Sequence, residues 1–234
     1  MTTDESRSSS RSYTSICTSI FGRTCPELTE KARAAFEQGT DLVEFRLDYL
    51  RPQSFEETKT CLSEFTERSV LTVRSRAEGG RYRGSESERL DFIHNLMELN
   101  AAFVDVELET AEGDKDLPPP KGRQLIVSWH DWRGTPGRPR LASVLRRATA
   151  FGIPKIVTTA RAAEDNLSVL SLYSGHRGPP PIAFCMGENG ILSRVMALER
   201  GSPICFASLP GEPTAPGQLT LGQALAVRRL LQHD

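Results

Sequence analysis

The sequence lacks the features that mark several large classes of protein. Its 234 residues carry no excess of either charge, with 29 lysines and arginines against 30 aspartates and glutamates and a formal net charge of -1. Such a balance gives no electrostatic footprint for nucleic acid or an anionic membrane, so we expect neither as a partner. No apolar run approaches the roughly 18 to 20 residues of a membrane-spanning helix, so we expect no membrane segment.

Cysteine is scarce, and its spacing suggests neither a zinc site nor a disulfide framework. The five cysteines are widely scattered, at Cys17, Cys25, Cys61, Cys185 and Cys205. An odd number without close pairs favours a reducing cytoplasm and predicts no metal site. Residues 1–12, M-T-T-D-E-S-R-S-S-S-R-S, lack the apolar core of a signal peptide. We expect them to form a disordered tail before a single domain over residues 13–234.

Apolar runs of strand length recur along the chain with amphipathic segments between them. The eight runs cover residues 14–20, 42–47, 70–74, 103–107, 125–130, 153–158, 182–186 and 204–207. The helical candidates cover residues 26–38, 55–66, 87–99, 141–150, 162–173, 190–198 and 221–231. Eight strand-helix units in one chain of this length predict an α/β fold, the (β/α)8 TIM barrel. An open doubly wound sheet is the competing architecture, but the Gly-rich phosphate loop typical of its first strand is absent.

Two stretches depart from the regular alternation. Residues 110–121 contain Gly113 and the run Pro118-Pro119-Pro120, so the fourth helix is expected to be short or missing. Residues 209–217 are rich in proline and glycine and follow the eighth strand. In a barrel, this stretch predicts a loop over the catalytic end.

Charged residues alternate with apolar ones on the second and third strands. Glu44, Arg46 and Asp48 share one face of the second strand, and Arg74 ends the third. A solvated strand face is one interpretation. In a barrel, however, the outward face packs on helices, so these charges would point inward, where they must be paired or used. By contrast, we interpret Arg76, Arg81 and Arg83 as solvated loop charges.

A histidine and a lysine occupy the next two strands along the sheet. His130 ends the fifth run and Lys155 lies inside the sixth, and adjacent parallel strands lie about 4.8 Å apart, so the two side chains can meet. A structural histidine and an edge-strand lysine are the alternatives, and the second fails in a closed barrel. A lysine buried beside cations such as Arg74 is expected to have a lowered pKa. A neutral amine beside an imidazole is suited to Schiff-base chemistry on a carbonyl.

Six motifs, in this order along the chain, resemble those of the type I 3-dehydroquinate dehydratase (3-dehydroquinase) family, which has a (β/α)8 barrel. They are E-F-R-L-D (44–48), T-V-R-S-R-A-E-G-G (72–80), S-W-H-D-W (128–132), P-K-I (154–156), M-G-E-N-G-I-L-S-R (186–194) and A-P-G-Q (215–218). Any one of them is weak, but six in order are highly specific. Two departures stand out: Thr214 replaces the usual serine before A-P-G-Q, and Trp129 and Trp132 flank the His-Asp pair where tyrosine and phenylalanine are commoner.

The resemblance implies a hydro-lyase of the shikimate pathway, which leads to the aromatic amino acids. It implies dehydration of 3-dehydroquinate to 3-dehydroshikimate through an imine, without metal or organic cofactor, in a homodimer. The implied catalytic residues are Lys155 as imine-forming amine, His130 as general base and acid, and Glu78 as the group that orients the imidazole. The implied substrate-binding residues are Glu44, Arg46, Arg74, Arg194, Thr214 and Gln218.

Two other functions compete with this interpretation. A class I aldolase would use the same lysine to cleave a carbon bond, but the E-F-R-L-D and A-P-G-Q motifs speak against it, and no phosphate loop is evident after the last two strands. A non-catalytic barrel that only binds a ligand or a protein would have no use for a buried amine beside a histidine.

Overall fold

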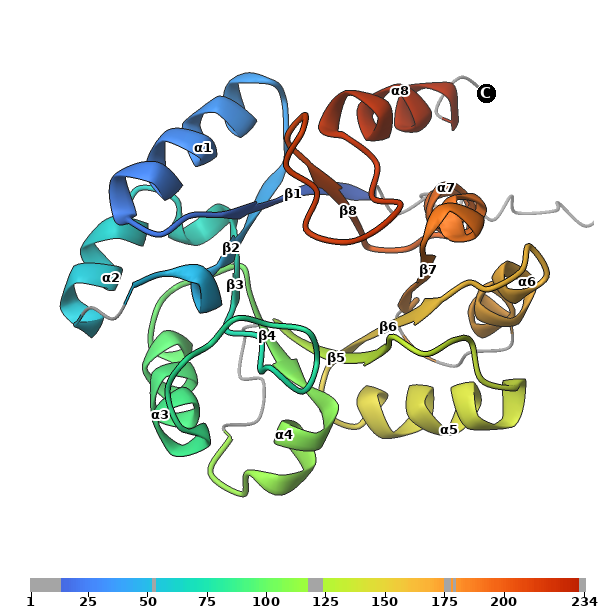
Figure 1. Cartoon of the computed structure of the whole chain (residues 1–234), viewed down its shortest axis with the longest axis horizontal. Helices are drawn as coiled ribbons and strands as arrows, with labels where there is room; N and C mark the ends of the chain where they lie inside the picture. Colours follow the sequence, from blue (N-terminus) through green and yellow to red (C-terminus); the bar gives the residue numbers. More distant parts are fainter. Residues whose placement is uncertain (1–13, 52–53, 118–123, 175–177, 179, 232–234) are drawn as a thin grey trace, which may run out of the picture.

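The computed structural model describes residues 14–51, 54–117, 124–174, 178 and 180–231, and the predicted tail lies outside these ranges. Eight parallel strands form one sheet at the centre, with the helices around its outside (Figure 1). The strands are β1 (Ser15–Phe21), β2 (Leu42–Arg46), β3 (Ser69–Thr72), β4 (Phe103–Glu107), β5 (Gln124–Asp131), β6 (Ile153–Thr159), β7 (Ile182–Met186) and β8 (Ile204–Ser208). The predicted TIM-barrel class is confirmed.

The helices follow the strands in turn. They are α1 (Cys25–Glu37), α2 (Phe55–Leu62), α3 (Glu86–Met97), α4 (Leu108–Gly113), α5 (Arg138–Thr149), α6 (Asp165–Leu170), α7 (Ile191–Glu199) and α8 (Leu221–Leu231). Short 3-10 turns lie at η1 (Leu47–Tyr49), η2 (Thr66–Arg68), η3 (Ser171–Tyr173) and η4 (Glu188–Gly190). Helices α2 and α3 begin at serine capping boxes, in which Ser54 pairs with Glu57 and Ser85 with Glu88.

The fourth helix is short, as predicted. Helix α4 has six residues, and the proline run expected to end it lies outside the described residues. No helix in the described part of the chain is long and apolar enough to cross a membrane.

The barrel is nearly closed rather than fully closed. Strands pair in the order β7-β6-β5-β4-β3-β2-β1-β8, and among the described residues β7 and β8 share no ladder. The expectation of a sheet without edges was therefore too strong. Strand β6 still pairs with β5 on one side and β7 on the other, so Lys155 does not lie on an edge strand.

Strand alternation separates the barrel interior from the layer under the helices. Outward-facing side chains such as Val43, Phe45 and Val127 form the large core with helix residues such as Leu28 and Leu141. Inward-facing side chains form an apolar base, made of Cys17, Val70, Ile126, Ile153, Val157, Ile182, Phe184, Met186, Ile204 and Phe206. The inward positions nearer the carboxyl ends of β2 to β5 carry polar and charged groups instead, and Lys155 adds one within β6, so the strands place a polar site above an apolar floor.

Candidate active site

A cavity of about 60 Å³ lies at the carboxyl ends of the strands. Its lining includes all nine predicted site residues: Glu44, Arg46, Arg74, Glu78, His130, Lys155, Arg194, Thr214 and Gln218. They come from β2, β5, β6, α7, the β3–α3 loop and the β8–α8 loop, which curves over the end of the barrel (Figure 1). The structure thus brings together residues that lie as much as 174 positions apart in the sequence, although their roles stay predictions.

Lys155 is buried at the centre of the cavity, with 5% of its surface exposed. Its Nζ lies 2.9 Å from Asp105 Oδ2, 3.7 Å from Glu44 Oε1 and 3.8 Å from the centre of the Phe206 ring. The sequence predicted a cation, Arg74, as the charged neighbour of this lysine. The structure instead places the carboxylates of Asp105 and Glu44 nearest to Nζ.

Asp105 is the main residue of the site that the sequence interpretation missed. Its Oδ1 accepts hydrogen bonds from Arg74 Nη2 and Ser128 Oγ, each at 2.6 Å, while Oδ2 accepts from Lys155. Burial raises the pKa of Asp105, but the charges of Arg74 and Lys155 outweigh this and hold it well below its ordinary range. Its position inside the apolar run F-V-D-V-E, with the same alternation as Glu44, was a signal that could have identified it.

Glu44 is held as a carboxylate under the lysine. Ser19 Oγ donates to it at 2.5 Å and Thr72 Oγ1 at 2.9 Å. Burial raises its pKa, but Lys155 and Arg46 lower it below its ordinary value overall. Strand β2 therefore presents a fixed negative charge to the cavity, as the inward-facing interpretation of E-F-R-L-D predicted.

Arg46 and Arg74 form the positive side of the cavity. Arg46 binds Asp48 in a two-bond fork, with distances of 2.8 and 2.9 Å. Arg74 Nη1 donates to Ser128 Oγ at 2.6 Å and lies 3.4 Å from both Glu78 and Glu107. Burial disfavours the charged form of Arg74, yet its acidic neighbours, led by Asp105, raise its pKa overall.

His130 and Glu78 form a hydrogen-bonded pair beside the lysine. His130 Nδ1 lies 2.8 Å from Glu78 Oε2, and its ring stacks on Trp132 with centroids 6.4 Å apart. Burial, together with the charges of Arg74 and Lys155, lowers the pKa of His130 well below its ordinary value. Burial also raises the pKa of Glu78 to about 7, against the opposing charge of Arg74. A neutral imidazole that donates Nδ1–H to the Glu78 carboxylate leaves Nε2 free to accept a proton.

The two glycines after Glu78 are required by this geometry. Gly79 has a φ of +81°, in the left-handed region that glycine adopts at little cost. Gly80 lies so close to the backbone that a Cβ atom there would fall 2.0 Å from the carbonyl oxygen of Arg74. The E-G-G sequence therefore folds the loop back on β3 and directs Glu78 at His130.

Arg194 is a buried guanidinium without an acidic partner. Only 4% of its surface is exposed, and it forms no ion pair with any described residue. Its Nη2 donates to the Pro216 carbonyl at 3.3 Å, the group stacks on Phe184 at 4.3 Å, and Nε has no hydrogen-bond partner within the described ranges. Burial lowers its pKa to about 10. Such an arginine, facing a cavity, is suited to bind an anionic group of a ligand.

Thr214 and Gln218 hold the β8–α8 loop over the cavity. Gln218 Oε1 accepts from Thr214 N at 2.8 Å and from Thr214 Oγ1 at 3.0 Å, and Gln218 Nε2 donates to the Ala207 carbonyl at 3.0 Å. Threonine keeps the hydroxyl that this contact uses. The departure from serine therefore leaves the loop hydrogen bond intact.

The cavity carboxylates are all engaged by basic groups or by the imidazole. In the part of the chain that the structure describes, no group of three or more histidines, cysteines or acidic residues is arranged to hold a metal ion.

Comparison with known proteins finds relatives along nearly the whole chain. The family model described as Type I 3-dehydroquinase matches residues 16–234. A 3-dehydroquinate dehydratase of Methanococcus maripaludis strain S2 is 34% identical over 92% of this chain and 99% of its own. One from Methanothermobacter thermautotrophicus is 37% identical over 88% of this chain and 92% of its own. The crystal structure of 3-dehydroquinate dehydratase from Geobacillus kaustophilus HTA426 superposes with a TM-score of 0.85 at 25% identity, covering 94% of this chain and 91% of that one.

Proposed function

The chain belongs to the type I 3-dehydroquinase family, and on that premise we propose that Lys155, His130 and Glu78 catalyse its reaction. The enzyme is a hydro-lyase that removes water from 3-dehydroquinate to give 3-dehydroshikimate, a step of the shikimate pathway. A Schiff base between enzyme and substrate is characteristic of the family.

The proposed reaction begins and ends at the lysine. The Lys155 amine adds to the C3 ketone, one water leaves and one proton is taken up from solvent, which gives a protonated imine that acidifies the C2 hydrogen. His130 Nε2 takes the C2 proton and returns it to the departing C1 hydroxyl, which leaves as water. Hydrolysis of the protonated imine consumes one water and frees product, amine and the proton taken up, so the net change is the loss of one water. The 2.8 Å contact with Glu78 supports the imidazolium that forms in between.

The unpaired guanidinium of Arg194 is the single observation that carries the substrate assignment. It is buried in the same cavity as Lys155 and His130, and it lacks an acidic partner among the described residues, so a substrate carboxylate completes its charge balance. Glu44 and Arg46 line the same cavity and are proposed to position ring hydroxyls, with Arg74 supplying positive field near the imine.

The loop that carries Thr214 and Gln218 is proposed to open and close over the substrate. The cavity of about 60 Å³ is small for a cyclic carboxylic acid, and we propose that a shift of this loop or of the side chains beneath it widens the cavity on binding. Closure then excludes water that would hydrolyse the imine early.

Borohydride trapping tests the lysine assignment. Intact mass is measured after 3-dehydroquinate and borohydride are added to wild type, to Lys155→Ala and to the matched control Lys59→Ala, whose lysine lies on the surface. We expect a ligand-sized adduct on wild type and control but not on Lys155→Ala. A folded wild type that forms no adduct would overturn the Schiff-base mechanism. Turnover of sugar phosphates instead of 3-dehydroquinate would favour the aldolase alternative.

We also propose an oligomeric state, a cellular location and a domain extent. The homodimer implied by the family is supported by Leu167 of α6 and Ile191 and Leu192 of α7, which expose apolar surface on neighbouring helices that a second copy could cover. Sedimentation velocity tests the homodimer, and a monomer at micromolar concentration would contradict it.

A cytoplasmic location is supported by five free cysteines, and cell fractionation tests it. A single catalytic domain over residues 13–234 is supported by one sheet that contains every described strand.

A further inference from the structure

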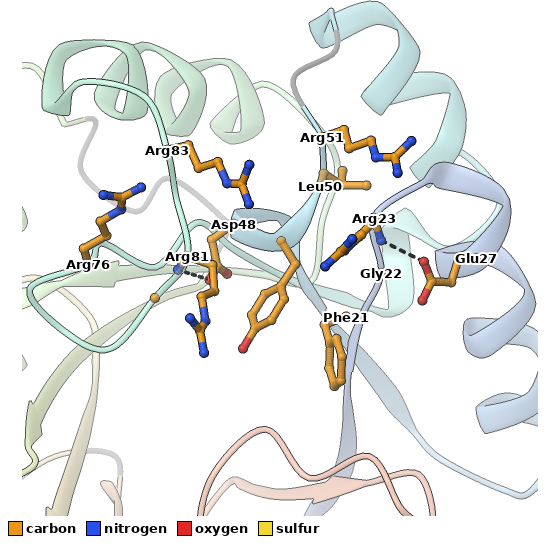
Figure 2. Close-up of a pocket in the computed structure, with 12 residues that line it drawn as sticks. Phe21, Gly22, Arg23, Glu27, Asp48, Leu50, Arg51, Arg76, Arg81 and Arg83 are labelled. Carbon is orange, nitrogen blue, oxygen red and sulfur yellow. Dashed lines mark hydrogen bonds between the residues drawn. The ribbon is translucent and has the colours of Figure 1, made fainter.

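A second and larger cleft, of about 890 Å³, lies beside the catalytic cavity. The segments that follow β1, β2 and β3 form it, so it opens at the catalytic end of the barrel. Figure 2 shows Arg76, Arg81 and Arg83 of the β3–α3 loop on one side and Arg23 and Arg51 on the other. The five arginines that line it are Arg23, Arg51, Arg76, Arg81 and Arg83, and we call it the arginine cleft.

The acidic residues of the arginine cleft do not balance these charges. Among the residues that the structure describes, only Asp48 and Glu27 contribute carboxylates to its lining. Asp48 is engaged by the fork of Arg46 and by the backbone N–H of Arg81 at 2.9 Å. Glu27 accepts from the backbone N–H of Arg23 at 2.8 Å and pairs with Lys31 at 3.3 Å. The cleft is therefore a local concentration of positive charge on a chain whose net charge is -1.

Four of the five arginine side chains have no partner among the described residues. Arg76 Nε donates to the Tyr82 carbonyl at 2.9 Å. Within the described residues, the guanidinium groups of the other four form no hydrogen bond and no ion pair, and all four side chains are exposed. Arginine stays protonated at any physiological pH, so an anion that enters the cleft meets positive charge at every such pH.

We propose that the arginine cleft binds a phosphorylated small molecule that carries at least two anionic groups. Guanidinium forks match the oxygens of phosphate, and several arginines around one cleft suit a ligand with more than one negative charge. Phe21, Tyr49 and Leu50 line the same cleft and offer apolar surface to the organic part of the ligand. The volume also lies within the range of small-molecule sites.

The arginine cleft is separate from the catalytic cavity but shares a wall with it. Glu78 and Gly79 line the catalytic cavity, and the next two residues, Gly80 and Arg81, line the cleft. The pair Arg46–Asp48 likewise has one member on each side. The proposal concerns this second site and does not depend on the catalytic roles proposed above. Arg76, Arg81 and Arg83 are exposed on a loop, as interpreted from the sequence, and the proposal adds a ligand to that interpretation.

Calorimetric titration with pyrophosphate, at constant ionic strength set with sodium chloride, tests the proposal. We expect saturable binding of one pyrophosphate per chain. In the double variant Arg81→Ser/Arg83→Ser, binding should weaken by about tenfold for each arginine removed, because a charge-assisted hydrogen bond contributes free energy of that order. The control Arg200→Ser/Arg229→Ser removes two exposed arginines near the ends of α7 and α8 and should bind as wild type does. Thermal melting without ligand checks that each variant is folded.

A third variant separates the two sites. Pyrophosphate bound at the catalytic arginine would be lost in Arg194→Ala, whereas binding in the arginine cleft should persist there, and loss in that variant alone overturns the proposal. Equal weakening in the Arg81/Arg83 and Arg200/Arg229 variants would show only general charge attraction. Binding of pyrophosphate that does not saturate would also overturn the proposal if, in addition, removal of Arg81 and Arg83 lowers kcat/KM in a salt-dependent way. The cleft would then serve to attract the anionic substrate. The binding results can be interpreted even if the enzyme proves inactive towards 3-dehydroquinate.

Discussion

Replacement of Asp105 by asparagine should be among the most damaging conservative changes in the barrel. The carboxylate is 2% exposed and accepts hydrogen bonds from Arg74, Ser128 and Lys155 at 2.6, 2.6 and 2.9 Å. Asparagine keeps the shape but removes the charge, so two buried cations lose their common counter-ion. Removal of one partner from a buried ion pair costs about 3 to 5 kcal/mol.

Urea unfolding measures this cost. The free energy of unfolding of a domain is typically about 5 to 15 kcal/mol. The loss, divided by the slope of the free energy of unfolding against urea concentration, should lower the urea midpoint by about 1 to 2 M. The control Glu64→Gln breaks the 2.6 Å pair with Arg33, in which both side chains are more than half exposed, and should leave the midpoint nearly unchanged.

The pH dependence of the Asp105→Asn effect provides a second check. Because the pKa of Asp105 is depressed in the folded protein, its stabilisation is present above the unfolded value of about 3.9 and is lost as the pH falls towards the folded value. The difference between wild type and Asp105→Asn should be complete at pH 7 and shrink below about pH 4. Equal midpoints at pH 7 would refute the ion-pair argument, as would a difference that does not change with pH.

Three further variants test the catalytic cavity. Glu78→Gln should lower turnover but still form the imine. Wild-type activity should rise through about pH 7, where Glu78 ionises, and this rise should be absent from the pH–rate profile of the variant. A variant profile identical to that of wild type would count against Glu78 as the group that orients His130. Arg194→Lys should raise KM at least tenfold while borohydride still traps the substrate, since an ammonium cannot form the two-bond fork with a carboxylate. An unchanged KM would contradict the assignment of the substrate carboxylate to Arg194. Gly80→Ala should be destabilised, because its Cβ would meet the Arg74 carbonyl at 2.0 Å, whereas Gly113→Ala has open space around it and serves as the control in thermal melts.

Local pattern in the sequence determined the framework of this protein. The alternation of apolar runs fixed which residues of each strand face inward, so the inward orientation of Glu44, Arg46 and Lys155 was predictable once the barrel was assumed. Helix starts at Ser54 and Ser85 follow from short-range capping, and the order of six motifs identified the family. These properties depend on neighbours a few residues apart or on the pattern of residue types, which a sequence displays directly.

Only the tertiary structure decided how the charges pair. Asp105 meets Lys155 across 50 positions of sequence and Arg74 across 31, and no local pattern specifies which of several inward acids approaches which cation. Among the described residues, the lack of a ladder between β7 and β8 and the meeting of three loops at the arginine cleft likewise depend on how the sheet curves. Electrostatic energy depends on distances of a few ångströms between side chains, and such distances exist only once the whole barrel has folded.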